Sequence, residues 1–321
     1  MKPMLRIYRD LPPPSDRPPC ALTIGNFDGV HRGHQAMLAH LRAAAQTRGL
    51  ATTVMTFVPH PREYFALQQR RPELAPTHVS GLRDKLAGLT DQGVERVILQ
   101  RFDARLANLS PQAFIEMLLV NGLNTKLLLV GEDFRFGHKR TGDIDTLREA
   151  GARHGFEVQT LSDITDIDGR RISSSEVRTA LAVGDLEGAK SLLGHDFAVS
   201  GHVIHGQKLG RTLGYPTMNL RVAPRCAARS GIYVVKVSGL GPVALPAVAS
   251  LGVRPTVEDD GRVLLEAFLL DATVDAYGKL VRVEFLHKLR DEEKFSDLAT
   301  LTTAIADDAS QARAYFAVHG L

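Results

Sequence analysis

A chain of 321 residues that is 44% hydrophobic and 23% charged has an ordinary globular composition and is long enough for two domains. The formal net charge of +3 is small and the basic residues are scattered, which argues against nucleic acid as a partner although the isoelectric point is 8.9. Cys20 and Cys226 are the only cysteines, and no segment reads as a signal peptide or a membrane span, so we expect a soluble, cytoplasmic protein without disulfides.

The first clear pattern in the chain is a strand, a tight loop and a helix within residues 22–35. A short apolar run ends at residue 24, glycines bound the turn at residues 25–29, and the apolar residues after His31 follow a helical period. A helix that begins after a glycine-rich loop presents free backbone N–H groups and the positive end of its dipole to an anion. His31 and His34 lie three residues apart in the first turn, so we expect both imidazoles to reach one phosphate.

Two other interpretations of this histidine pair stay open. One is a zinc site, although the pair has no nearby cysteine and no Glu in an H-E-x-x-H arrangement to complete a ligand set. The other is a purely structural turn. We favour the anion-binding loop.

A second strand is predicted over residues 51–57, which are rich in β-branched side chains, and it runs into His60 between two prolines. In an open α/β sheet, ligands bind in the crevice outside the carboxyl ends of the strands. His60 is therefore a candidate for the same nucleotide site as His31 and His34. The alternative is that a proline-flanked histidine only caps a turn.

Further along, helices and strands alternate and lead to a candidate binding loop. The predicted elements are a helix over 81–92, a strand over 95–99, a helix over 110–119 and a buried strand over 126–130. The loop that follows, residues 131–142, crowds polar and aromatic side chains, including Asp133, after an apolar strand. Alternatively, Phe134 and Phe136 in this loop only plug the edge of the domain.

Another helix is predicted to start within Ile-Ser-Ser-Ser-Glu-Val-Arg, residues 172–178. Ser173 and Glu176 have the spacing of a capping box, which needs no ligand. A helix N-terminus with several hydroxyls and a guanidinium also suits a triphosphate, because Arg178 offers a bidentate donor fork at any pH. We expect Arg178, together with Ser173, Ser174 and Ser175, to contact phosphate.

The pattern changes near residue 184, where short strands replace the alternation of strand and helix. A short helix over 185–193 is followed by predicted strands over 197–204, 231–237, 243–250, 262–270 and 280–286, and by a helix over 291–318. Regularly spaced strands without intervening helices indicate a barrel or sandwich. We therefore predict an α/β domain over residues 1–183 and a mostly antiparallel β domain, closed by a C-terminal helix, over residues 184–321.

The second domain contains its own glycine-rich segment, residues 201–220, which is not a Walker A sequence. Its glycines permit the backbone to wrap around phosphates, and its basic side chains supply charge. Thr217 and Asn219 place two neutral oxygens where a hard cation such as Mg²⁺, completed by phosphate and water, would sit. The residues involved in phosphate binding would be Gly206, Lys208, Gly210, Arg211 and Gly214. A glycine-rich hairpin without a ligand is the alternative.

Glu266 stands in an otherwise apolar strand, residues 262–270. Partial burial there would raise its pKa and make it a better general base, whereas an edge strand would leave it pointing to water. Arg290 and Glu293 follow in a charged stretch that reads equally well as a solvated helix start.

Several of these segments resemble one known family. Gly25-x-Phe27-Asp28-Gly29-Val30-His31-x-Gly33-His34 is similar to the G-x-F-D-x-x-H-x-G-H signature of the HxGH nucleotidyltransferases, in the version of bacterial bifunctional riboflavin kinase/FAD synthetases. Residues 205–219 resemble the riboflavin kinase signature H-G-x-x-x-G-R-x-x-G-x-P-T-x-N. Ser175 replaces a threonine of the family pattern, and Met218 stands where the family usually has a small residue. With both domains, the resemblance covers essentially the whole chain.

The resemblance implies a fold and a set of roles. The fold is a Rossmann-like α/β nucleotidyltransferase domain followed by a β-barrel kinase domain. His31, His34, Arg178 and Glu266 would be catalytic, and Thr217 and Asn219 would bind the metal. ATP for adenylyl transfer would contact Gly25, Phe27, Asp28, Gly29, His60, Asp133 and Ser173 to Ser175. Arg290 and Glu293 would lie near the flavin.

The expected function is therefore ATP-dependent phosphorylation of riboflavin to FMN by the second domain and adenylylation of FMN to FAD, with release of pyrophosphate, by the first. Mg²⁺ would accompany ATP. The partners would be these small molecules, without nucleic acid or membrane, and the chain would be a monomer or a transient oligomer. Another HxGH adenylyltransferase, acting on a pantetheine phosphate or nicotinamide mononucleotide, and a non-catalytic flavin sensor are the alternative functions.

Overall fold

The computed structural model describes residues 4–166, 169–206, 214–222, 225–253, 263–272 and 274–320. Contacts divide the chain into two compact units: the first is Met1–Pro76 with Lys85–Ser173, and the second is Thr77–Asp84 with Ser174–Leu321. The sequence placed the change of domain after residue 183. By its contacts, helix α7 (Ser174–Val183) joins the second unit, and so does a segment from early in the chain, Thr77–Asp84, which we call the strap.

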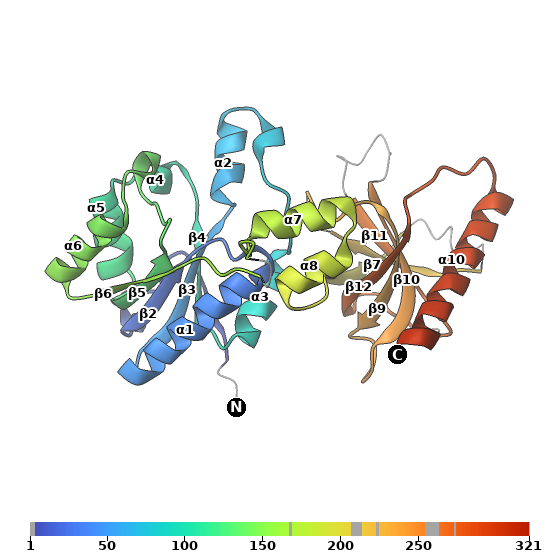
Figure 1. Ribbon diagram of the computed structural model, residues 1–321, viewed down its shortest axis with the longest axis horizontal. Coiled ribbons are helices and arrows are strands. Elements are labelled where there is room, and N and C mark those ends of the chain that lie inside the picture. Colours follow the sequence, from blue (N-terminus) through green and yellow to red (C-terminus); the bar gives the residue numbers. More distant parts are fainter. Residues whose placement is uncertain are drawn as a thin grey trace. The chain divides into compact units, whose positions relative to one another are not determined.

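The first unit is built on a six-stranded parallel sheet with the order β1-β4-β3-β2-β5-β6. All five residues of β2 are buried, as expected for a parallel strand covered on both faces. Helix α1 packs against β2, β3 and β5, and Figure 1 shows it running along the sheet. The strands are β1 (Arg6–Arg9), β2 (Cys20–Ile24), β3 (Ala51–Val58), β4 (Arg96–Arg101), β5 (Thr125–Gly131) and β6 (Glu157–Leu161).

Helices and short turns connect these strands. The α-helices are α1 (Arg32–Arg48), α2 (Pro61–Gln68), α3 (Leu82–Asp91), α4 (Ala104–Ala107), α5 (Pro111–Phe114) and α6 (Ile144–His154). The first turn of α3 belongs to the strap. A π-helix, η4 (Ile115–Val120), continues α5, and 3₁₀ turns occupy η1 (Pro14–Asp16), η2 (Asp28–Val30), η3 (Pro72–Leu74) and η5 (His138–Arg140).

The strand order places a topological switch point at the middle of the sheet. From β2 the chain proceeds to β3 and β4 on one side, whereas β5 and β6 lie on the other. Ligands of open α/β sheets bind outside the carboxyl ends of the strands at such a point. The loops after β2 and β5, both selected by the sequence analysis, arise at this point.

The second unit is a closed six-stranded antiparallel barrel with the order β10-β11-β8-β7-β12-β9. Side chains alternate between its interior and exterior, so Leu265, Ala267 and Leu269 of β11 are buried while Glu266 and Phe268 face outward. The strands are β7 (Ala198–Ile204), β8 (Thr217–Arg221), β9 (Gly231–Ser238), β10 (Leu245–Val253), β11 (Val263–Leu269) and β12 (Leu280–Arg290).

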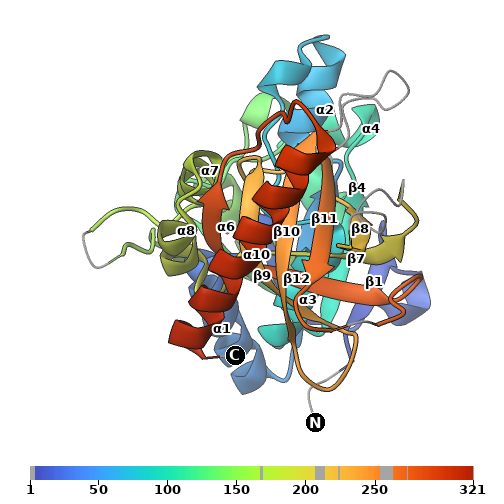
Figure 2. The same cartoon turned by 90° about the vertical axis from the view of Figure 1, so that its right-hand side faces the viewer.

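The C-terminal helix α10 (Leu298–His319) packs on the outside of the barrel against β10 and β9, as Figure 2 shows. Ala309, Ala312 and Phe316 join Val234 and Leu270 in a small apolar cluster there. Helices α7 and α8 (Leu186–Leu193) pack on each other and contribute to the barrel's core cluster.

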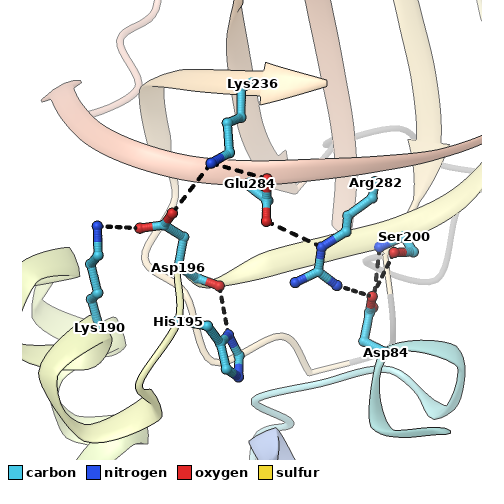
Figure 3. A network of polar contacts seen from close by, with 8 residues as sticks. All are labelled: Asp84, Lys190, His195, Asp196, Ser200, Lys236, Arg282 and Glu284. Atoms are coloured by element: carbon cyan, nitrogen blue, oxygen red, sulfur yellow. Dashed lines mark hydrogen bonds and ion pairs between the residues drawn. The ribbon is translucent and has the colours of Figure 1, made fainter. Parts of the chain in front are cut away.

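A network of charged side chains covers another part of the barrel exterior (Figure 3). It runs from α8 across the barrel strands to the strap, with separations of 2.9 to 3.6 Å between charged groups. The ion pairs are Lys190–Asp196 (2.9 Å), Asp196–Lys236 (3.6 Å), Lys236–Glu284 (3.3 Å), Glu284–Arg282 (3.4 Å) and Arg282–Asp84 (3.3 Å).

These observations confirm the predicted fold class, a Rossmann-like domain followed by an antiparallel barrel with a C-terminal helix. Three strands of the structure were not predicted: β1, β6 and β8. Of these, β8 lies inside the glycine-rich segment. The final helix begins at Leu298 rather than 291, because Asp297 caps it by accepting the N–H of Thr300. Among the described residues, no helix combines the length and apolar character needed to cross a membrane.

Candidate active sites

The loop after β2 is held in a strained conformation. Phe27 (φ 48°), Gly29 (φ 80°) and Val30 (φ 42°) all have positive φ angles. This region is unfavourable for a β-branched residue such as Val30, and such strain persists only where the surroundings hold the backbone. Here the fully buried Phe27 ring and the nearly buried Val30 anchor the loop in an apolar cluster. Burial of these two side chains therefore offsets the backbone strain and fixes the shape of the loop.

The two histidines of the loop lie together at the start of α1. Their ring centroids are 3.7 Å apart, and the planes are nearly parallel at 22°. His31 is 5% exposed and is the N-cap of α1, where its Nδ1 accepts the backbone N–H of His34 at 3.4 Å. A neutral His31 ring therefore carries its proton on Nε2.

Little space is left for a side chain at Gly33, between the two histidines. A Cβ on Gly33 would lie 3.1 Å from the carbonyl oxygen of Ile172 and 3.2 Å from the His31 ring. The chain just before Ser173 thus approaches the first turn of α1. Both segments were expected to contact the phosphates of ATP, and the observed approach of residue 172 to the first turn of α1 is compatible with that prediction.

A cavity of about 580 Å³ opens beside this loop in the first unit. Its lining combines aromatic rings with basic side chains. The aromatic residues are Phe57, Phe65, Phe102, Phe114, Phe134 and Phe136, the basic ones are His60, Arg62, Arg135, Lys139 and Arg140, and Gly25, Asn26 and Asp133 also line it. The arrangement suits a ligand with a flat ring system and phosphate.

Two expectations about this region had alternatives, and in both cases the two interpretations are compatible. His60 caps α2 by accepting the N–H of Arg62 at 3.1 Å, and it also lines the cavity. Phe136 is buried in the core, and Phe134 stacks on it at 5.8 Å, yet both rings line the cavity. Asp133 lines it as well, and forms an ion pair with Arg171 at 2.9 Å.

The segment that was expected to complete the phosphate site divides between the two units. Ser173 belongs to the first unit, whereas Ser174, Ser175 and Arg178 lie in α7 of the second. The Nε of Arg178 donates to the carbonyl of Thr77 in the strap at 2.7 Å. The phosphate-binding role of Arg178 stays a prediction.

The barrel carries a second candidate site, organised by its strand register. Arg290 pairs with Ile232, Ile232 with Ser250, Ser250 with Glu266, and Glu266 with Asn219. Directly paired residues of neighbouring strands project to the same face of a sheet. The register therefore brings residues from five strands into one row on the barrel exterior. At its end, the Thr217 hydroxyl lies 3.5 Å from Oε2 of Glu266.

A cavity of about 330 Å³ lies along this row. Its lining includes Tyr215, Thr217, Ile232, Val248, Ser250, Glu266, Phe268, Arg290, Glu292, Glu293, Phe295, Leu301, Ile305 and Asp308. Arg290 is fixed there by Asp308, which is 3% exposed and accepts from Nε at 2.9 Å and from Nη2 at 2.8 Å. This pairing raises the pKa of Arg290 further, so its charge is permanent.

Glu266 occupies a position between the two alternatives considered for it. It is half-buried and lines the cavity, so it neither sits in an apolar interior nor points only to bulk water. Phe268, two residues along the same face, lines the cavity with it. Arg290 and Glu293, which were expected near a flavin, line the same cavity.

Part of the glycine-rich segment can be placed. Gly206 passes so close to Asn219 that a Cβ would lie 2.4 Å from its Nδ2. Asn219 is 4% exposed, and its Oδ1 has no hydrogen-bond partner among the described residues. Gly214 has a φ of 83°, which favours glycine. Lys208, Gly210 and Arg211 lie outside the described residues.

Several lining residues were missed by sequence reasoning: Arg62, Phe65 and Phe102 in the first unit, and Ser250, Glu292 and Asp308 in the second. None stands in a glycine-rich or histidine-rich pattern, and only strand pairing and helix docking bring them to the cavities. In the part of the chain that the structure describes, no group of three His, Cys, Asp or Glu side chains has the arrangement of a metal site.

Known proteins match both units in the same order. A family model described as FAD synthetase matches residues 14–176, and one described as riboflavin kinase matches residues 193–316. A bifunctional riboflavin kinase/FMN adenylyltransferase of Escherichia coli (strain K12) is 46% identical over 297 residues, covering 92% of this chain and 93% of the relative. The protein of that name from Pseudomonas fluorescens is 45% identical over 295 residues, covering 92% of each.

Among solved structures, one titled as a macrolide-efflux protein from Streptococcus pneumoniae has a TM-score of 0.77 and 30% identity, with 96% of this chain and 98% of that chain covered. Its title differs from the description of both family models, and the sequence relatives decide the assignment. The chain belongs to the family of bifunctional riboflavin kinase/FMN adenylyltransferases.

Proposed function

We propose that this protein makes both flavin cofactors. The second unit transfers the γ-phosphoryl group of ATP to riboflavin and forms FMN, and the first unit joins the AMP moiety of a second ATP to FMN, which yields FAD and pyrophosphate. The observation that carries the proposal is that each unit has its own cavity at the motif that the sequence analysis selected.

In the first unit, the chain's own residues bind and orient the phosphates. The N-terminus of α1 and the stacked pair His31 and His34 supply donors for the charge that develops on the transferring phosphoryl group. The aromatic rings that line the 580 Å³ cavity pack on the flavin ring, and basic side chains of the lining such as Arg62 and Arg140 bind the FMN phosphate. No covalent intermediate is needed, because positioning and electrostatic stabilisation suffice for this transfer.

In the second unit, Glu266 orients the terminal hydroxyl of riboflavin and accepts its proton. The cavity wall of Phe268, Tyr215 and Phe295 supplies apolar surface for the ring. Arg290, held by Asp308, keeps a fixed positive charge at the other end of the row.

Magnesium is the cation that these residues fit. The Oδ1 of Asn219 is buried without a hydrogen-bond partner among the described residues, and Thr217 is two residues away on the same face of β8. Two neutral oxygens are enough, because Mg²⁺ takes much of its coordination from phosphate and water. When bound with ATP, it would neutralise charge on the phosphates.

The proposal extends to the cellular location, the oligomeric state and the partners of the protein. We place the protein in the cytoplasm, as a monomer or transient oligomer with small-molecule partners alone, because it has only two cysteines and its basic residues are scattered.

One experiment tests both activities. The purified chain is incubated with riboflavin, ATP and magnesium, and the products are separated by chromatography over time. FMN should form first and FAD should follow, and FMN supplied alone with ATP should give FAD. Absence of both products would overturn the proposal, and adenylylation of nicotinamide mononucleotide or a pantetheine phosphate in place of FMN would favour a different adenylyltransferase.

A further inference from the structure

The cavity of the barrel holds more carboxylates than its chemistry requires. Besides Glu266, it is lined by Glu292, Glu293 and Asp308. Both oxygens of Asp308 are used by Arg290. Glu292 and Glu293 are thus the two carboxylates of this cavity that have no role so far, and their contacts differ.

The side chain of Glu292 lies against Ser250 and Gly252 of strand β10, a position that we call its seat. Its Oε1 accepts the hydroxyl of Ser250 at 3.3 Å, and a Cβ on Gly252 would lie only 1.9 Å from that same oxygen. Ser250 and Gly252 are two residues apart and so share one face of the strand. The carboxylate therefore lies over β10 in the space that the absent side chain of Gly252 leaves.

This seat places Glu292 next to Glu266. Ser250, which donates to Glu292, is the direct cross-strand partner of Glu266. The residue as a whole is exposed, but desolvation of its carboxylate, together with the negative charge of Glu266, outweighs the opposing effects of Ser250 and Arg290 and raises the pKa of Glu292 above its ordinary value. Two carboxylates thus face one cavity across a serine, although one is enough to serve a single reacting hydroxyl.

The chemistry of the substrate supplies a use for the second carboxylate. A ribityl chain carries further hydroxyls beside the terminal one, and each that enters a cavity needs an acceptor to replace water. A carboxylate accepts several hydrogen bonds, so it suits a polyol. Given the proposed riboflavin kinase activity, we propose that Glu292, seated by Gly252 and Ser250, is a specificity-determining residue that binds the inner hydroxyls of the ribityl chain.

The test compares two substrates on the full chain. Riboflavin is one, and the other is its hydroxypentyl analogue, which keeps the ring and the terminal hydroxyl and lacks the inner hydroxyls. Wild type should prefer riboflavin in kcat/KM. Glu292→Gln should lose about 10- to 100-fold in kcat/KM for riboflavin, mainly through KM, because hydrogen bonds to a charged group are lost. It should leave the analogue nearly unchanged, so the preference collapses.

Two further variants distinguish the effect of the position of the Glu292 carboxylate from the effect of its charge. Gly252→Ala keeps the carboxylate but displaces it, and Ser250→Ala removes its donor, so both should weaken the preference in the same direction. Glu187→Gln, the same change at an exposed residue of α8, is the control and should retain the preference.

Three outcomes would overturn this inference: an unchanged preference in Glu292→Gln, an equal loss for both substrates, or a collapse caused by Glu293→Gln instead. A wild-type protein that phosphorylates neither flavin would instead refute the proposed kinase activity, so the two failures are distinguishable.

Discussion

Asp84 and Arg282, 198 residues apart in sequence, form an ion pair of 3.3 Å on the exterior of the barrel (Figure 3). The same carboxylate accepts the backbone N–H of Ser200 at 3.1 Å and its hydroxyl at 2.5 Å. At the other end of the strap, His78 pairs with the segment 225–227, and Val79, 3% exposed, joins the barrel's core cluster. A piece of chain from between elements of the first unit is thus built into the second.

Removing the Asp84 carboxylate should destabilise the second unit. Asp84→Ala leaves the N–H of Ser200 without its acceptor and removes one of the two carboxylates that pair with Arg282, and we expect a loss of about 1–3 kcal/mol. Calorimetry should show a lower unfolding temperature, and riboflavin phosphorylation should be lost at a lower temperature. Asp145→Ala, whose side chain is 82% exposed beside Arg148, is the control and should have little effect. Equal behaviour of the two variants would mean that the Asp84 carboxylate does not stabilise the barrel.

The two activities should separate by fragment, and the choice of boundary should matter. A fragment of residues 184–321 should convert riboflavin to FMN and stop there. It lacks Val177 and Leu181 of α7, which are buried in the barrel's core cluster, each worth about 1.5–3 kcal/mol. A fragment of residues 174–321 should therefore be more stable, and a peptide of residues 77–84 should stabilise it further. Equal thermal stability of both fragments would contradict the assignment of α7 to the second unit.

Truncation of His34 should affect only the first activity. If the pair acts on the transition state, His34→Ala should slow FMN adenylylation by about 10²- to 10³-fold in kcat, with a smaller effect on KM for ATP. Riboflavin phosphorylation should stay near the wild-type rate. Stoichiometric zinc in the parent protein, with loss of the fold in the variant, would support the zinc interpretation instead.

The complementary variants lie in the barrel. Glu266→Ala and Asn219→Ala should abolish formation of FMN from riboflavin, because the first removes the base and the second removes an oxygen proposed to bind Mg²⁺. Conversion of supplied FMN to FAD should be largely unchanged. A parallel loss of FAD synthesis from FMN would show that the two sites are not independent.

Low pH should release a stabilising contact of the barrel. Asp291 accepts from Nε (3.0 Å) and Nη2 (2.7 Å) of Arg229 and contacts Lys288, which together lower its pKa from 3.8 to about 2. A carboxylate whose folded pKa is depressed stabilises the fold above its unfolded pKa and loses that effect as the pH falls. Denaturation curves of wild type and Asp291→Asn should therefore differ at pH 6 and converge between about pH 4 and pH 2. A difference that stays constant down to pH 2 would show that this pair does not titrate as described.

The site of the first unit was largely predictable because its determinants are local. His31 and His34 are related by the period of one helix, and the glycines that shape the loop lie within the same ten residues. The carboxyl ends of β2, β3 and β5 meet because parallel strands share one edge, so His60 and Asp133 were also assigned to the cavity that they line.

The rest depends on contacts between residues far apart in the chain, which no local pattern contains. Glu266 was singled out by its apolar surroundings in sequence, but its face, its half-burial and its neighbour Ser250 follow from the register of β10 and β11. The contact of Glu292 with Gly252 depends on the closed barrel. The ion pair of Asp84 with Arg282 depends on the packing of the strap in the second unit. The sequence by itself determined the two glycine-rich motifs, which we expect to bind phosphate, and the order of the domains, because backbone conformation and helical spacing are set by neighbouring residues. The tertiary structure alone decided which side chains surround each cavity, because strand register and helix docking are set by burial of the whole core.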